Sequence, residues 1–270
     1  MIGYGYGNGA ENTGCKDGPS SLGELNLSTI LSSSETTQQL DAIPEIARLS
    51  AELAALTSSA VKQHQPFTVI GGDNTCSIGT WSGAASAIEG PLGLIWLDAH
   101  MDSHTVETSP SNNVHGMPLA CLLSYGDERL TTIMRDTPKL LPEHTCLVGV
   151  RSFEPGEAEL LKLLNIRVFY ADEVHKRGLS AVMKDAIGIA KQGTAGFGFC
   201  LDLDVIDPVD APGVGTPEPN GLHGDEVITC LKGISEDKQF LGCEICEFNP
   251  HEDKENKTQR LIVDLLGAIF

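Results

Sequence analysis

Two acidic segments, each at the end of an apolar run, are the part of this sequence best equipped for chemistry. The segment 98–102 reads Asp-Ala-His-Met-Asp and follows the run 94–97, and the segment 202–204 reads Asp-Leu-Asp and follows the run 196–201. Apolar runs of this length predict buried strands, along which side chains alternate between the two faces. Acidic residues two positions apart at such a strand end can therefore reach the same side.

Four carboxylates and one imidazole at one place would repel one another strongly unless cations lay between them. An oxygen-rich set with one imidazole suits Mn²⁺ better than Zn²⁺ or Cu²⁺. Two unrelated acidic loops are the alternative, but two strand ends with the same spacing favour one shared site for two metal ions. The ligands predicted from this spacing are Asp98, His100, Asp102, Asp202 and Asp204.

Length and charge limit the class of protein. The 270 residues are 41% hydrophobic, which is enough for the packed core of one large domain or two small ones. The net charge of −19 argues against a nucleic-acid partner, whose phosphates need Lys and Arg. It is compatible with a cationic substrate or bound metal, and equally with an acidic surface. No membrane-spanning run or N-terminal signal pattern is found, so no membrane partner is expected.

The eight cysteines do not form the pattern of a disulfide framework. Most lie in apolar surroundings, which is typical of buried thiols in a reducing compartment, and the predicted location is cytoplasmic. Cys243 and Cys246 form one CxxC pair inside an apolar run that predicts a strand. Positions i and i+3 of a strand face opposite ways, so no zinc or redox role is expected for this pair.

Apolar runs alternate with helical patterns along the chain, which predicts an α/β protein with a parallel sheet covered on both faces. Ligands of such sheets lie beyond the carboxyl ends of the strands, where both acidic segments fall. The expected strands are 67–70, 93–98, 145–149, 166–170, 197–203 and 240–247, and the expected helices are 43–63, 79–88, 156–164, 180–191, 224–234 and 258–267.

The glycine-rich stretch from Gly3 to Ala10 contains part of a dinucleotide-binding pattern. Only Ile2 follows the first Met before it, so no full strand is expected there, and no helical pattern follows before Pro19. We predict a flexible loop near the rim of the site rather than a phosphate-binding turn.

Six short motifs, in order between Gly71 and Pro250, resemble the ureohydrolases, the arginase and agmatinase family of binuclear manganese hydrolases, with arginases the most similar. A weaker similarity lies at 14–19. The resemblance implies a three-layer α/β/α arginase-type fold with a central, mostly parallel sheet, in a single domain over residues 1–270. The motifs are Gly71-Gly72-Asp73-Asn74, Asp98-Ala99-His100-Met101-Asp102, His115-Gly116-Met117-Pro118, the segment 202–208, Gly213-Val214-Gly215-Thr216-Pro217 and Glu247-Phe248-Asn249-Pro250.

The resemblance also implies two Mn²⁺ ions per chain, with Asp98 and Asp202 bridging them. Asn74 stands where the family usually has a histidine, and an amide oxygen is a weaker ligand, so the metal that it shares with Asp102 is expected to be held more loosely. His100 and Asp204 would complete the other metal's set. The full set of ligands implied in this way is Asn74, Asp98, His100, Asp102, Asp202 and Asp204, and the catalytic residues implied are His115 as proton shuttle, Glu247 on the guanidinium, and Asp102.

For the substrate, the segment 98–115 resembles arginases more than agmatinases, which implies hydrolysis of L-arginine to ornithine and urea. Matching positions imply Ser111 and Asn113 for the α-carboxylate, Glu154 for the α-amino group and Thr216 at the guanidinium end. Glu154 also suits a helix N-terminus, where acids are favoured.

Two further positions depart from the family pattern. His104 replaces an asparagine common at the carboxylate rim, and Cys200 replaces a small hydroxyl residue. The alternatives left open are a hydrolase of agmatine, a guanidino acid or a formimino compound, and a catalytically weak pseudoenzyme. The family resemblance also implies a homo-oligomer, a trimer or hexamer.

Overall fold

One parallel sheet organises the molecule. The structure, a computed structural model, describes residues 1–23 and 25–270, and within them eight strands pair in the order β2-β1-β3-β8-β7-β4-β5-β6. Every strand pair is parallel, so a crossover connection must link strands that follow one another. The strands are β1 (Ile2–Gly5), β2 (Thr29–Ser32), β3 (Phe67–Gly71), β4 (Leu92–Leu97), β5 (Leu140–Val150), β6 (Arg167–Tyr170), β7 (Gly196–Asp202) and β8 (Phe240–Cys246).

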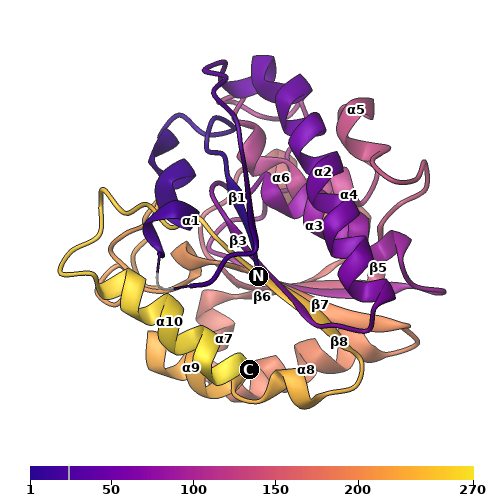
Figure 1. The fold of residues 1–270 in the computed structure, drawn as a ribbon. Coiled ribbons are helices and arrows are strands. Elements are labelled where there is room, and N and C mark those ends of the chain that lie inside the picture. Colours follow the sequence, from indigo (N-terminus) through magenta and orange to yellow (C-terminus); the bar gives the residue numbers. More distant parts are fainter. Residues whose placement is uncertain (24) are drawn as a thin grey trace.

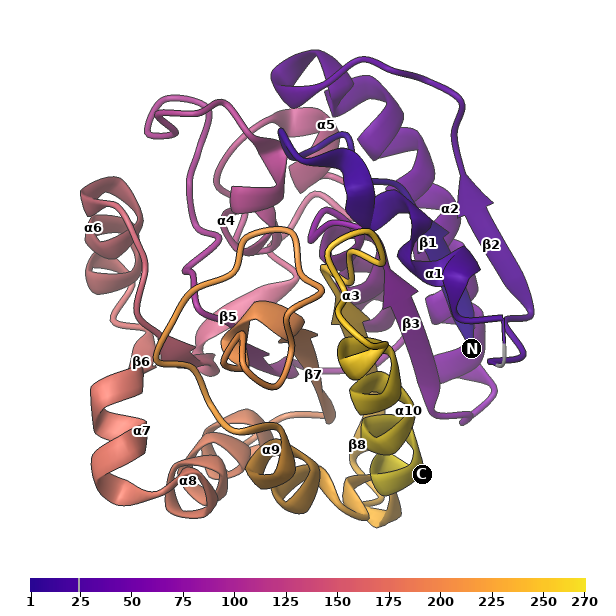
Figure 2. The same cartoon turned by 90° about the vertical axis from the view of Figure 1, so that its left-hand side faces the viewer.

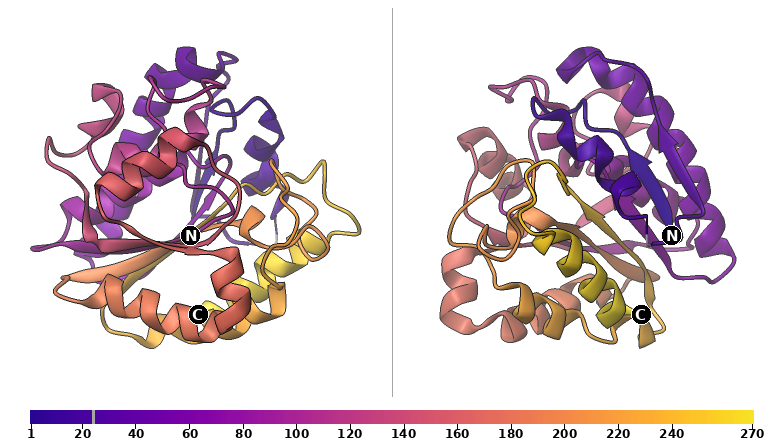
Figure 3. Two further views of the ribbon diagram at one scale, coloured as in Figure 1. Left: turned by 180° about the vertical axis from the view of Figure 1, so that it is seen from behind. Right: turned by 60° about the vertical axis from the view of Figure 1, so that its left-hand side comes forward.

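Helices cover both faces of this sheet, in the three-layer arrangement that was predicted (Figure 1). Helices α2–α6 lie on one face and α7–α10 on the other, as the view from behind also shows (Figure 3). Helices α9 and α10 pack side by side (Figure 2). The helices are α1 (Gly18–Ser21), α2 (Ile43–Lys62), α3 (Cys76–Ser86), α4 (Pro118–Leu122), α5 (Glu128–Thr131), α6 (Pro155–Leu163), α7 (Ala171–Arg177), α8 (Leu179–Lys191), α9 (Gly224–Leu231) and α10 (Lys257–Ile269).

The sheet separates two hydrophobic cores. In β4, Leu94 and Trp96 pack into the core beneath α2–α6, whereas Ile95 and Leu97 pack into the core beneath α7–α10. A strand buried on both faces needs an apolar residue at every position, which is why the inner strands are continuous apolar runs in the sequence. Within the described residues, no helix is long and apolar enough to cross a membrane.

All six expected strands and all six expected helices are present, with ends shifted by a few residues. The expectation of a flexible loop from Gly3 to Ala10 is wrong for Gly3–Gly5, because Ile2–Gly5 forms β1 between β2 and β3. Its backbone pairs with Val69–Gly71, and the neighbouring Tyr4 and Tyr6 side chains are buried. This strand was not predicted because its glycines leave it without an apolar run. Pairing with the neighbouring strands and the burial of two tyrosines stabilise it instead.

Candidate metal and catalytic site

The candidate site lies where four neighbouring strands end. Strands β3, β8, β7 and β4 are adjacent in the middle of the sheet. Asp98 follows β4, Asp202 ends β7, Glu247 follows β8, and Asn74 lies three residues beyond β3. Because parallel strands finish at the same edge, these four side chains meet although they are far apart in the chain.

One group of side chains has the geometry of a cation site. His100 Nδ1 lies 3.0 Å from Asp204 Oδ2 and 3.5 Å from Asp98 Oδ1, and the ligand atoms of all three residues lie within 4.8 Å of one another. Trp96 Nε1 donates to Asp98 Oδ2 at 2.8 Å and fixes that carboxylate. Burial lowers the pKa of His100, but attraction by Asp204 and Asp98 and the hydrogen bonds to both carboxylates together outweigh it and raise the pKa overall. Two carboxylates and an imidazole therefore fit one divalent cation.

Asn74 points into the remaining carboxylates, as expected, but with its nitrogen rather than its oxygen. Asn74 Nδ2 donates to Asp98 Oδ2 and Asp202 Oδ2, both at 3.3 Å, and makes a short hydrogen bond to Asp102 Oδ2. Its oxygen, Oδ1, accepts from Ser77 Oγ at 2.9 Å. The amide nitrogen thus occupies the point on which three carboxylates converge.

The buried carboxylates around Asn74 can all be ionised only if positive charge lies among them. Burial, followed by repulsion from neighbouring carboxylates, raises the pKa of Asp98, Asp102 and Asp202. Ser77 has a single hydroxyl proton and also hydrogen-bonds Glu244, so its oxygen can accept from Asn74 if the amide turns over. A turned amide would present its oxygen to a cation. The residues therefore fit a second cation once Asn74 has turned.

His115 and Glu247 form a pair beside the carboxylates. His115 Nδ1 lies 3.1 Å from Glu247 Oε1, which also accepts from the backbone N–H of Asn74 at 3.0 Å. Glu247 Oε2 accepts from Cys15 Sγ at 3.1 Å. Burial lowers the pKa of His115, but the hydrogen bond to Glu247 and attraction by Glu247 and Asp73 together outweigh it and raise the pKa overall. The pair can hold a proton and a negative charge next to each other.

Two of the predicted residues have strained backbones. Asp102 and Glu247 lie in the left-handed region, with φ of 48° and 64°. Such a conformation costs a non-glycine residue about 1–3 kcal/mol and is concentrated at functional sites. Both turns direct their carboxylates toward Asn74.

A cavity of about 470 Å³ opens onto the site. Asn74 and Asp98 do not line this cavity, whereas the other predicted metal, catalytic and substrate-binding residues do. These are His100, Asp102, His104, Ser111, Asn113, His115, Glu154, Asp202, Asp204, Thr216 and Glu247.

At the rim of the cavity, Glu154 already has a partner. His104 Nε2 lies 2.9 Å from Glu154 Oε2, and His104 Nδ1 lies 3.1 Å from Thr108 Oγ1. Glu154 is also the N-cap of α6, in a capping box with Glu157 whose Oε2 accepts from Glu154 N at 3.0 Å. Burial raises the pKa of Glu157 to about 7. Glu154 therefore caps the N-terminus of α6, as its sequence position suggested, and its carboxylate also lines the cavity.

The structure adds Asp73, which was not singled out although it lies in the first motif. Asp73 is fully buried, and its Oδ2 accepts from Gly9 N at 2.8 Å. Burial, followed by repulsion from Glu247, raises the pKa of Asp73 to about 7. A Cβ on Gly9 would lie 2.8 Å from Asp73 Oδ2, so the glycine allows the N-terminal segment to reach this carboxylate.

Arg151 was also missed, because it binds only backbone. Its guanidinium donates to the carbonyl oxygens of Asp204 at 2.6 Å, Glu218 at 2.9 Å and Pro219 at 3.0 Å. These bonds fix the loop that carries Asp204. Glu218 in turn places a carboxylate oxygen 3.7 Å from His100 Nε2.

Comparison with known proteins assigns the chain. The model of the Arginase family matches residues 1–270. The chain belongs to the arginase family. Arginase from Bacillus caldovelox is 41% identical over 225 residues, 83% of this chain and 75% of that protein.

Solved structures agree with this family assignment. The B. caldovelox arginase structure has a TM-score of 0.89 at 35% identity, covering 100% of this chain and 96% of the other. Entamoeba histolytica arginase in complex with L-ornithine has a TM-score of 0.89 at 28% identity, covering 100% and 97%. Formimidoylglutamase from Bacillus subtilis, at 23% identity and a TM-score of 0.79 over 98% and 83%, shares the fold.

The structure also places the three residues that the sequence analysis expected to depart from the arginase-family pattern. Asn74 faces the carboxylates with its nitrogen, and His104 contacts the rim carboxylate of Glu154. Cys200 is fully buried on the sheet and does not line the cavity, with its Sγ 3.4 Å from Glu244 Oε1.

Proposed function

We propose that this chain is a metal-dependent hydrolase that cleaves the guanidinium group of L-arginine to give L-ornithine and urea. The observation that carries the proposal is that the His115–Glu247 pair and the carboxylate cluster open into one cavity. Membership of the arginase family and similarity to an arginase that binds L-ornithine support it.

We propose two Mn²⁺ ions as the cofactor. Asp98, His100 and Asp204 would hold one, and a second would lie among Asp98, Asp102, Asp202 and a turned Asn74. Bound cations of this kind lower the pKa of water to about 7, so that a nucleophile is available at neutral pH. The extra cost of turning Asn74 supports unequal binding of the two ions.

Glu247 and His115 would act on the substrate. The Glu247 carboxylate faces the cavity and can accept charge-assisted hydrogen bonds from a guanidinium, which would neutralise a buried negative charge. His115 Nδ1 is held by Glu247 Oε1, which leaves Nε2 to exchange a proton with the leaving amine. The raised pKa of His115 supports a protonated ring that can act as the acid.

The polar rim would select the amino-acid end of L-arginine. Ser111 and Asn113 line the cavity for the α-carboxylate, and Gln39 Nε2 holds their loop by donating to Ser111 O at 3.0 Å. Glu154 would accept the α-amino group, in competition with His104. Thr216 would line the guanidinium end.

Urea or formamide release from a substrate panel in the presence of Mn²⁺ tests the proposal. L-Arginine should have the highest kcat/KM among L-arginine, agmatine, a guanidino acid and formiminoglutamate. A higher kcat/KM for another compound of the panel would support the hydrolytic reaction but refute L-arginine as the substrate. No turnover of any member at any supplied Mn²⁺ concentration would identify a pseudoenzyme.

The family resemblance supports three further proposals. We propose that residues 1–270 act as one ureohydrolase domain, that the chain assembles into a homo-oligomer, a trimer or hexamer, and that it works in the cytoplasm. Light scattering of the purified protein measures the assembly, and a monomeric mass would refute that part.

A further inference from the structure

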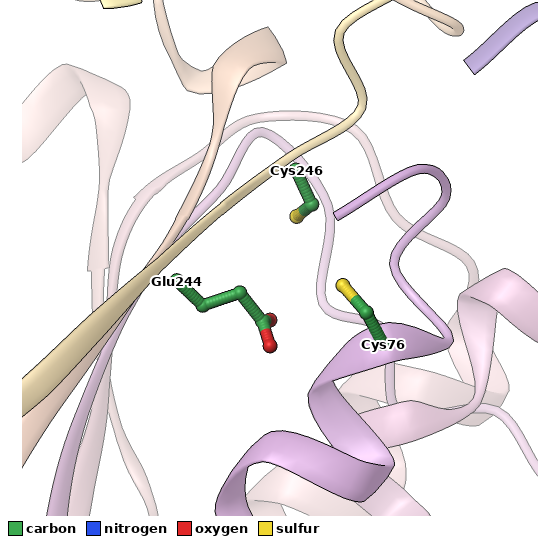
Figure 4. A group of neighbouring side chains, drawn as sticks. All are labelled: Cys76, Glu244 and Cys246. Carbon is green, nitrogen blue, oxygen red and sulfur yellow. The ribbon is translucent and has the colours of Figure 1, made fainter. Parts of the chain in front are cut away.

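A cluster of sulfur and carboxylate groups lies in the core directly behind Asn74. We call it the thiol cluster, and it consists of Cys76, Cys200, Glu244 and Cys246. The ligand atoms of Cys76, Glu244 and Cys246 lie within 4.8 Å of one another. Figure 4 shows these three side chains turned toward a common space from the start of α3 and from β8. Cys200 Sγ lies 3.4 Å from Glu244 Oε1.

The fold brings the four side chains together from three elements. Cys200 of β7 and Glu244 of β8 are paired across the strands, so they share a face, and Cys246 is two residues beyond Glu244 on that face. Cys76 is the first residue of α3. Any Cβ on Gly71 would collide with Cys76 Sγ, so this glycine makes room for the thiol.

The carboxylate of Glu244 is the unusual member of the cluster. Its side chain is fully buried. Glu244 Oε1 accepts a short hydrogen bond from Ser77, but Oε2 has no hydrogen-bond partner among the residues that the structure describes. A buried carboxylate oxygen without a partner is costly, and native proteins rarely keep one without a ligand or other function. Buried thiols alone are common in cores, but this carboxylate among three thiols is not explained by packing.

We propose that the thiol cluster is a binding site for one thiophilic divalent cation, of the Zn²⁺ type, separate from the carboxylate cluster in front of it. Cys76, Cys246 and Glu244 would be ligands, with Cys200 beside them as a fourth donor. On binding, the protons of Cys76 and Cys246 pass to solvent, and two thiolates and one carboxylate surround the two positive charges of the ion, which leaves one net negative charge at the site.

The chemistry of the donors separates this site from the catalytic one. Thiolates select soft cations such as Zn²⁺, whereas carboxylates suit Mn²⁺. A mixed sulfur and carboxylate set is within the range that Zn²⁺ accepts, and Zn²⁺ is usually bound by four donors in a tetrahedron. The protein would therefore hold two kinds of metal in adjacent compartments.

A Co²⁺ titration of the full-length protein, under reducing conditions and with Mn²⁺ present, tests the proposal. Cobalt bound to thiolate gives a strong sulfur-to-metal charge-transfer band, which carboxylate and imidazole ligands do not give. The wild type should develop this band with one equivalent of Co²⁺. The variant Cys76→Ala/Cys246→Ala should lose it, whereas Cys146→Ala, which removes a buried thiol of the opposite core, should keep it.

Two results would overturn the proposal: no charge-transfer band in the wild type, or a band of equal strength in the double variant. X-ray absorption of the Zn²⁺-loaded wild type gives a test that does not depend on how the variants fold. It should show sulfur neighbours at the ion, and a shell of only nitrogen and oxygen would refute the site. Hydrolysis of L-arginine is a separate readout, so the two proposals can fail independently.

Discussion

Replacing Asn74 by histidine should tighten the weaker of the two metal sites. In the structure, the Asn74 amide donates from Nδ2 to Asp98, Asp102 and Asp202, and its oxygen faces away, toward Ser77. A cation among the three carboxylates must first displace this donor. A neutral imidazole offers a lone pair directly and is a stronger ligand than an amide oxygen.

The size of the effect follows from the hydrogen bonds that the cation must break. A hydrogen bond to a charged group contributes about 1.5–3 kcal/mol. Loss of the one short bond from Asn74 to Asp102 therefore weakens cation binding by roughly 10- to 100-fold, at about 1.4 kcal/mol per tenfold change in Kd. Asn74→His removes this penalty, so we expect half-saturation at a Mn²⁺ concentration lower by at least about tenfold.

Bound metal and activity are measured against free Mn²⁺ in both proteins. The control is Asn26→His, which adds the same imidazole at an exposed position remote from the carboxylates. Only the weaker of the two Mn²⁺ binding steps should shift in Asn74→His, and neither should shift in Asn26→His. Equal or weaker affinity in Asn74→His would refute the reasoning, because the amide would then not be the obstacle. The prediction concerns metal affinity and not kcat.

Three further variants test the residues at the cavity. His115→Ala should lower kcat by roughly 100- to 10,000-fold with metal content unchanged, and wild-type kcat would remove His115 from the mechanism. Glu247→Gln should lower kcat/KM by roughly 10- to 100-fold, as expected when a charged hydrogen bond of about 1.5–3 kcal/mol becomes neutral; an unchanged kcat/KM would contradict its role. His104→Asn should lower KM for L-arginine by about fivefold, because the substrate amine no longer displaces a hydrogen bond of about 1 kcal/mol from Glu154. Thr108→Val removes the hydroxyl beside His104 Nδ1 and leaves the contact between His104 Nε2 and Glu154 in place, so it should leave KM unchanged. Equal effects of Thr108→Val and His104→Asn on KM would refute competition between His104 and the substrate amine.

The inner strands could be predicted from the sequence because burial on both faces requires continuous apolar runs, as in β4 and β7. The outer strands β1 and β2 could not. They are four residues each, and β1 alternates glycine with larger residues. Their stability comes from pairing with a neighbour distant in the chain, which no local pattern encodes.

The carboxylates of Asp98, Asp102, Asp202 and Asp204 were predictable because they lie at, or a few residues beyond, the ends of two recognisable strands. The orientation of the Asn74 amide was not, since it depends on which neighbour accepts and which donates. The contact between His104 and Glu154 joins two loops 50 residues apart and has no sequence signal. Likewise, the CxxC spacing correctly placed Cys243 and Cys246 on opposite faces, but only the strand order puts Cys246 near Cys76 and Glu244.

Anomalous scattering at the Mn edge, from crystals grown with Mn²⁺, tests the central claim most directly. The claim is that this arginase-family chain holds an unequal pair of cations at the carboxyl edge of its sheet. We expect a strong peak among Asp98, His100 and Asp204, and a weaker peak beside Asp102 and Asp202 with the Asn74 oxygen turned toward it. No peak at either position at any Mn²⁺ concentration, or two peaks of equal occupancy at limiting Mn²⁺, would contradict the account.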